Sequence, residues 1–143
     1  MSQPSIWGLA PNRQAAPQSL ILVVEDNERN ARLTVAMLAA GGYQTRVAVD
    51  GIEGCQLAVE LQPSLIITDL QMPRLDGLAM TRALKLDPRT SEIPVIAVSA
   101  HALNEHRDAA LDAGCVQFLP KPLRLRELSN EVTNVIGCQL PDA

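Results

Sequence analysis

The sequence has 143 residues, a size typical of one domain with its own hydrophobic core. Its formal net charge is -4, and its 12 basic residues are scattered, which argues against a nucleic-acid-binding face. We expect neither a membrane protein nor a secreted one, because the sequence has no membrane-length apolar run and no secretory signal. Three widely spaced cysteines predict reduced thiols in the cytoplasm, with no disulfide framework and no zinc site.

The chain divides into a tail, a domain and a second tail. Residues 1–18 hold three prolines among small and polar residues, which predicts an irregular N-terminal tail. Trp7, the only tryptophan, lies in this tail, and a docking segment for a partner is the alternative interpretation. We expect one domain over residues 19–137 and a short C-terminal tail over residues 138–143.

Within this domain, apolar runs alternate with segments of helical periodicity. Buried strands are predicted at 19–24, 43–49, 65–68, 93–98 and 116–119. Periodic apolar residues mark helices at 31–38, 52–59, 75–86, 103–113 and 125–136. Asn27 is the expected N-cap of the first helix, Gly41 and Gly42 end it, and Asp50-Gly51 is read as a turn. Five strand–helix units predict an α/β fold, a parallel sheet with helices on both faces.

Polar residues follow four of these strands at their carboxyl ends, where ligands collect in open α/β sheets. They are Glu25, Asp26, Asp69, Ser99 and Lys121. Each alone has a structural explanation, because such residues also cap helices, begin turns or face solvent. Together they would place three carboxylates, a hydroxyl and an ammonium group in one crevice.

This set of groups predicts a metal and phosphoryl chemistry. Two unit charges ~4 Å apart repel by roughly 4 kcal/mol at an effective dielectric constant near 20. One lysine cannot compensate three acids, so we expect a hard cation with oxygen ligands, Mg²⁺. An aspartate can act as the nucleophile and hold an aspartyl phosphate, while the metal and the ammonium group neutralise the transferring group.

Four motifs carry a family resemblance: ILVVEDN at 21–27, LIITDLQMPRLDG at 65–77, VIAVSA at 95–100 and FLPKP at 118–122. With them, the chain resembles the receiver domain of two-component response regulators, the family of the bacterial chemotaxis regulator. The resemblance covers roughly residues 19–137. It implies a flavodoxin-like (βα)5 fold with the strand order 2-1-3-4-5.

The resemblance also implies roles for individual residues. Asp69 is the implied phosphoacceptor, and Glu25 and Asp26 are the implied acid pair. Asp26 would bind Mg²⁺ directly and Glu25 through water, and the backbone carbonyl of Gln71 would complete the protein ligands.

Further implied roles concern the ends of the last two strands. Ser99, where threonine is commoner, is the implied switch hydroxyl, and Lys121 would pair with the phosphoryl group. The Lys121–Pro122 peptide bond is expected to be cis. Phe118 matches the switch aromatic of the family, although an ordinary core aromatic explains it equally well.

The function predicted from this resemblance is that of a single-domain response regulator and not of an enzyme. It would accept a phosphoryl group from a phosphohistidine of a sensor kinase or phosphotransfer protein. Ser99 would then move toward the phosphoryl group, and Phe118 would rotate into the space it leaves. The signal would leave through the face of the fourth helix, fifth strand and fifth helix, in a monomer or a phosphorylation-dependent dimer, without nucleic-acid or membrane partners.

Three alternatives stay open at this point. An aspartyl-phosphate phosphatase would need a second acid two residues after its nucleophile, and this position is Gln71. A scaffold could keep the fold and signal without phosphorylation, although the acids, Ser99 and Lys121 are all present. An FMN-binding protein would need aromatic residues for stacking, and the chain has one Trp, one Tyr and one Phe.

Overall fold

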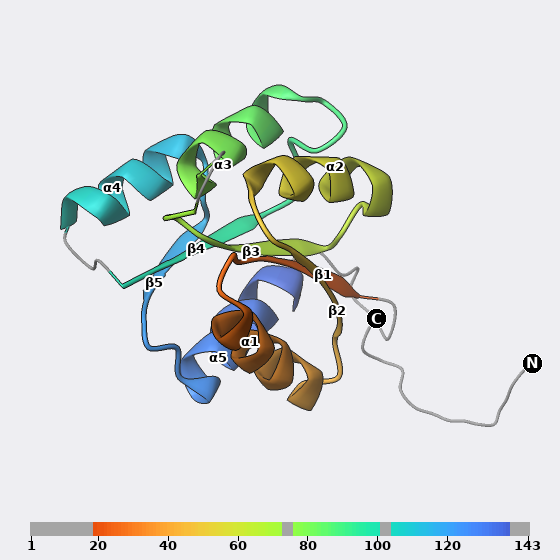
Figure 1. Cartoon of the computed structure of the whole chain (residues 1–143), viewed down its shortest axis with the longest axis vertical. Coiled ribbons are helices and arrows are strands. Elements are labelled where there is room, and N and C mark those ends of the chain that lie inside the picture. Colours follow the sequence, from red (N-terminus) through yellow and green to blue (C-terminus); the bar gives the residue numbers. More distant parts are fainter. Residues whose placement is uncertain (1–18, 73–75, 101–103, 138–143) are drawn as a thin grey trace, which may run out of the picture.

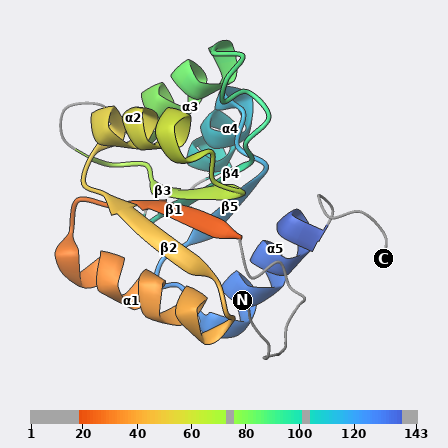
Figure 2. The same cartoon turned by 90° about the vertical axis from the view of Figure 1, so that its right-hand side faces the viewer.

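The computed structural model describes residues 19–72, 76–100 and 104–137. They form a parallel sheet with α1 and α5 on one face and α2, α3 and α4 on the other (Figures 1 and 2). The strands are β1 (Leu20–Val24), β2 (Gln44–Ala48), β3 (Leu65–Asp69), β4 (Val95–Ser99) and β5 (Gln117–Pro120). The helices are α1 (Glu28–Ala40), α2 (Gly51–Leu61), α3 (Gly77–Leu86), α4 (Asn104–Ala113) and α5 (Leu125–Gly137).

The order of the strands in the sheet is β2-β1-β3-β4-β5, and every neighbouring pair is parallel. This confirms the predicted flavodoxin-like α/β fold. The chain order reverses between β1 and β3, which lie side by side with Val23 opposite Ile67. Such a reversal opens a crevice outside the carboxyl ends of the two strands. The fold therefore brings the residues that follow β1 next to those that end β3.

The core consists of two apolar layers, one on each face of the sheet. Ile21 and Val23 of β1 face α1 and α5, whereas Leu22 and Val24 face α2, α3 and α4. All four side chains are 2% exposed or less. Because both faces of the central strands are covered, these strands read as continuous apolar runs in the sequence.

Several element boundaries differ from the predicted ones for local reasons. β4 begins at Val95 because Pro94 has no N–H to donate, although its carbonyl accepts a hydrogen bond from the backbone of Ile66. Asp50, predicted to begin a turn, is instead the buried N-cap of α2 and accepts a 2.8 Å hydrogen bond from Glu53 N–H. The N-cap predicted at Asn27 is confirmed.

Some predictions fall on residues that the structure does not describe. The two tails, residues 1–18 and 138–143, are among them, as are Leu75 and Leu103 at the predicted helix starts. The division into tails and domain therefore stays a prediction. No helix in the described ranges is long and apolar enough to cross a membrane.

Candidate functional site

The acid pair and Asp69 meet because β1 and β3 are neighbours. Glu25 and Asp26 directly follow β1, and Asp69 is the last residue of β3. The backbone N–H of Glu25 donates a 2.9 Å hydrogen bond to the carbonyl of Ala48, so the ladder with β2 continues one residue past β1. This hydrogen bond fixes the backbone from which the acid pair projects.

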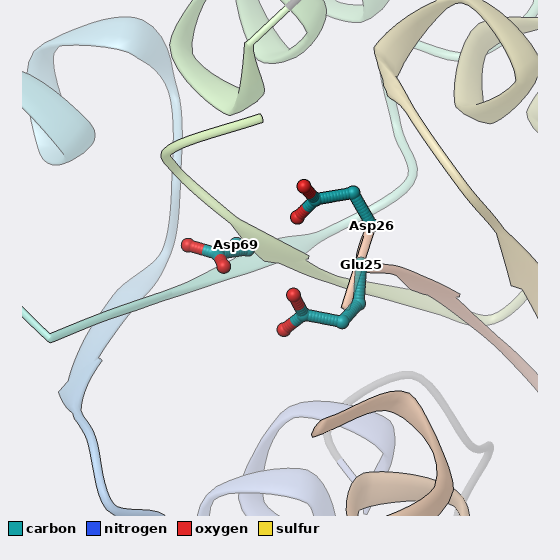
Figure 3. Close-up of side chains that lie close together, drawn as sticks. All are labelled: Glu25, Asp26 and Asp69. Carbon is teal, nitrogen blue, oxygen red and sulfur yellow. The ribbon is translucent and has the colours of Figure 1, made fainter. Parts of the chain in front are cut away.

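The three carboxylates form one acidic cluster at the sheet edge. One oxygen from each of Glu25, Asp26 and Asp69 lies within 4.8 Å of the others. Figure 3 shows the three side chains turned toward the same side of the strand ends. Glu25 is buried, Asp69 is half-buried and Asp26 is exposed. Closely spaced carboxylate oxygens with one open side suit a hard divalent cation that keeps some of its water.

Lys121 joins this cluster from the residue after β5. Its Nζ lies 2.9 Å from Oδ2 of Asp69 and 3.1 Å from Oε1 of Glu25. Its backbone N–H donates a 2.8 Å hydrogen bond to the carbonyl of Ser99, and the Lys121–Pro122 peptide bond is cis, as the resemblance implied. Burial lowers the pKa of Lys121, but its hydrogen bond to Asp69 and the charges of Asp69 and Glu25 outweigh burial, so the pKa is raised. The lysine therefore stays an ammonium group.

The acidic cluster destabilises the ionised form of Glu25. Burial and the nearby charge of Asp69 raise its pKa, while the N–H of Asn27, 3.2 Å from Oε2, and Lys121 oppose the shift. The shift means that the ionised form of Glu25 is less stable in this cluster than in water. A bound cation would remove that penalty, so the donor set fits the expected metal.

The backbone around Asp69 is held by contacts that the sequence motifs did not reveal. Oδ1 of Asp69 accepts a 3.2 Å hydrogen bond from Gln71 N–H. The backbone carbonyl of Asp69 accepts a 2.8 Å hydrogen bond from the Thr68 hydroxyl. A Cβ on Gly77 would overlap this carbonyl oxygen and lie 3.0 Å from Cα of Leu70. Gly77 is therefore a steric requirement of the site.

The two implied switch residues come from β4 and β5, on the side of β3 opposite to β1. Ser99 ends β4 at the same sheet edge and is 1% exposed. Phe118 is 2% exposed and packs in the apolar layer beneath α4 with Ala110. The guanidinium carbon of Arg107 lies 5.5 Å from the centroid of the Phe118 ring, a cation–π contact that sequence reasoning missed.

Known proteins share sequence similarity with the part of the chain that builds this site. Residues 21–133 match the response regulator receiver domain family. The chain belongs to this family. It is 35% identical over 117 residues to the polar-differentiation response regulator DivK of Brucella anthropi, a match that covers 82% of this chain and 95% of that protein.

The chain is also similar to two solved structures that contain receiver domains. The receiver domain of the sensor histidine kinase PA1611 from Pseudomonas aeruginosa, which has a magnesium ion in its active-site cleft, is 34% identical with a TM-score of 0.79. That match covers 84% of this chain and 98% of the other. A chain in the co-crystal structure of the Saccharomyces cerevisiae phosphotransfer protein Ypd1 and the receiver domain of Ssk1 is 26% identical, with a TM-score of 0.79, over 88% and 94% of the chains.

Family membership decides between the interpretations of the sequence. The chain is a response regulator receiver, a protein that accepts a phosphoryl group on an aspartate from a histidine kinase or phosphotransfer protein. This favours the receiver over the phosphatase and FMN-binding alternatives. Receivers bind Mg²⁺ in an acidic cleft, and the cluster of Glu25, Asp26 and Asp69 is such a cleft, which confirms the expected cofactor.

Proposed function

We propose that Asp69 is the phosphoacceptor. The observation that carries this assignment is its position: it is the member of the acidic cluster that ends the central strand β3 and lies 2.9 Å from Lys121 Nζ. A carboxylate oxygen of Asp69 attacks the phosphorus of a phosphohistidine, a P–O bond forms, and the P–N bond breaks as the imidazole leaves and takes up a proton. Attack by water on the phosphorus later releases inorganic phosphate and restores the carboxylate.

In this proposal Asp26, Asp69 and the carbonyl of Gln71 would hold Mg²⁺ directly, and Glu25 would act through water. Asp26 is exposed and Glu25 is buried, which supports Asp26 as the direct ligand and Glu25 as the indirect one. A direct ligand must reach the open side of the acidic cluster. When bound there, the metal would supply positive charge next to the transferring group.

Lys121 and Ser99 would contact the phosphoryl oxygens from the other side. The ammonium group of Lys121 already lies within hydrogen-bond distance of Asp69 and stays charged because of its two carboxylate partners. It neutralises charge that develops on the phosphoryl oxygens. Ser99, at the end of β4, donates its hydroxyl to one of these oxygens.

We further propose that a movement of the Ser99 hydroxyl changes the face formed by α4, β5 and α5. Ser99 moves toward the phosphoryl group, and Phe118 turns into the space that opens, which shifts an existing equilibrium. Leu111 of α4, Val116 beside β5 and Leu125 of α5 are 44–51% exposed and give this face apolar contacts for a target protein or a second copy.

The phosphodonor is a sensor histidine kinase or a histidine phosphotransfer protein, and no nucleic acid or membrane takes part. We place the protein in the cytoplasm as part of this proposal. The free thiols of Cys55 and Cys115 support a reducing compartment.

The experiment measures the intact mass of the protein after incubation with acetyl phosphate and Mg²⁺. The wild type should gain one phosphoryl group, whereas Asp69→Asn, or the wild type with excess chelator, should gain none. Asp76→Asn is the matched control, because Asp76 is an exposed carboxylate that caps α3 next to the same loop.

Two results would contradict the proposal. Labelling of Asp69→Asn at the wild-type level would place the phosphoryl group elsewhere. Absence of labelling in the wild type, although Mg²⁺ binds, would favour the scaffold that signals without phosphorylation.

A further inference from the structure

An apolar groove runs between α1 and the edge strand β2, on the side of α1 away from α5. It has a volume of about 670 Å³. Its lining includes Ala31 and Val35 of α1, Val47 of β2 with Val49 just after the strand, and the acids Asp26 and Glu28 at one end. Figure 2 shows β2 as the outermost strand of the sheet, with α1 running below it.

The groove exists because α1 leaves the outer strand partly uncovered. Val47 lies opposite Val23 of β1 and therefore points to the face that α1 and α5 cover. Val23 is 2% exposed, yet Val47 is 37% and Val49 is 51% exposed. These two exposed valines form an apolar patch along the groove that a second apolar surface can cover.

The acidic end of the groove limits the chemistry of its occupant. Asp26 and Glu28 are exposed carboxylates, and Glu28 already pairs with Arg32 at 2.8 Å. A suitable occupant is apolar in its middle, carries basic groups and has no acid of its own. Residues 1–18 have this composition: they include Ile6, Trp7 and Leu9, and Arg13 is their only charged side chain.

The chain also has the reach to place this segment in the groove. The carbonyl of Ser19 accepts a 3.1 Å hydrogen bond from Gln44 N–H, so the segment leaves the domain beside the first residue of β2. The groove lies at the other end of β2, a strand whose five residues span about 17 Å. Ten extended residues span up to ~33 Å, so residue 9 can reach Val49 with slack.

We propose that the N-terminal segment docks in this groove of its own chain, with Trp7 against Val47 and Val49. The docked segment lies beside Asp26, at the edge of the acidic cluster. This inference does not rest on the proposed phosphorylation of Asp69, and its test needs no phosphodonor.

Trp7 is the only tryptophan of the chain, so its fluorescence reports on this contact directly. The experiment compares the full chain with a synthetic peptide of residues 1–18. We expect a blue-shifted emission maximum and a several-fold lower acrylamide quenching constant in the full chain. Val47→Asn/Val49→Asn should return both values toward those of the peptide. Leu125→Asn, whose side chain is 51% exposed like that of Val49, should leave them unchanged.

A second measurement keeps the proposal testable if the double variant does not fold. In amide NMR spectra, Trp7→Ala should shift the resonances of Val47 and Val49 and leave those of Leu111 and Val116 in place. Emission and quenching equal to the free peptide would overturn the proposal. Protection of Trp7 that depends on protein concentration, with a dimer in sedimentation, would also overturn it in favour of docking on a second copy.

Discussion

Gly77 lies so close to Asp69 that no Cβ fits between the first residue of α3 and the Asp69 carbonyl oxygen. The N–H of Gly77 donates a 3.1 Å hydrogen bond to the carbonyl of Leu70, which closes the loop tightly. The start of α3 is thus packed against the backbone that presents the proposed phosphoacceptor. Any side chain at position 77 must push this backbone away.

We predict that Gly77→Ala lowers the free energy of unfolding by about 1–3 kcal/mol, the usual cost of overpacking. It should also slow labelling by acetyl phosphate, because Asp69 moves relative to Lys121. Urea unfolding and intact mass measure the two effects. Gly137→Ala is the control, since a Cβ there meets no atom within 4 Å. Equal stability of the two variants would show that the loop tolerates the methyl group.

A second prediction concerns the metal-free stability of the acidic cluster. Burial and the charge of Asp69 raise the pKa of Glu25, so stability falls as pH rises through the folded-state pKa of this residue. We therefore expect Glu25→Gln to be more stable than the wild type at neutral pH without metal. This gain should vanish at acidic pH, where Glu25 is protonated. Urea unfolding of both proteins at several pH values, in the presence of chelator, measures this difference in stability.

The same substitution should weaken Mg²⁺ binding by ~10–100-fold, the usual loss when a supporting group of a metal site is removed. Isothermal titration calorimetry measures the affinity. Glu28→Gln is the matched control, because Glu28 is an exposed acid outside the cluster. The account fails here if Glu25→Gln binds Mg²⁺ as well as the wild type does.

A third prediction concerns Lys121, whose pKa is raised because its carboxylate partners outweigh burial. A raised lysine pKa adds stability at neutral pH that is lost as pH rises through the folded-state pKa. Lys121→Met should therefore lower the neutral-pH free energy of unfolding by about 1–3 kcal/mol. The difference from the wild type should shrink at strongly alkaline pH. Arg124→Met, at an exposed position, is the control, and an equal loss there would refute the role of the ion pairs.

A fourth prediction concerns the contact between Arg107 and Phe118. Phe118 is the only phenylalanine, so fluorophenylalanine labelling gives one ¹⁹F resonance for the ring. Arg107→Gln removes a contact of about 0.5–1 kcal/mol and should shift this resonance toward that of the beryllofluoride-bound protein. Arg82→Gln, on the exposed side of α3, is the control. A resonance that beryllofluoride moves and Arg107→Gln does not would mean that Arg107 does not hold the ring.

Much of the fold can be predicted from the sequence because the central strands are covered on both faces. The runs 19–24 and 65–68 are apolar for that reason, and their ends located the acid pair and Asp69. The strand order came from the resemblance, since alternation alone specifies a parallel sheet without an order. Pro94 has no N–H to donate, so β4 begins at Val95, two residues after the predicted start at residue 93.

The contacts that support the site could not be predicted from motif spacing. The Thr68 hydroxyl bonds the Asp69 carbonyl, and Arg107 covers Phe118, but neither pair has a sequence pattern of its own. Asp50 was misread because a turn and a helix N-cap favour the same residues. These contacts depend on how elements pack, and only the three-dimensional structure contains that information.

The most direct test of the central claim is to locate the phosphoryl group on the chain. The protein is labelled with acetyl phosphate and Mg²⁺ and then treated with borohydride, which reduces an acyl phosphate to an alcohol and converts the aspartate to homoserine. Peptide mass spectrometry then finds the changed residue. We predict homoserine at position 69 alone. Conversion at Glu25 or Asp26, or labelled protein with position 69 unchanged, would contradict the assignment.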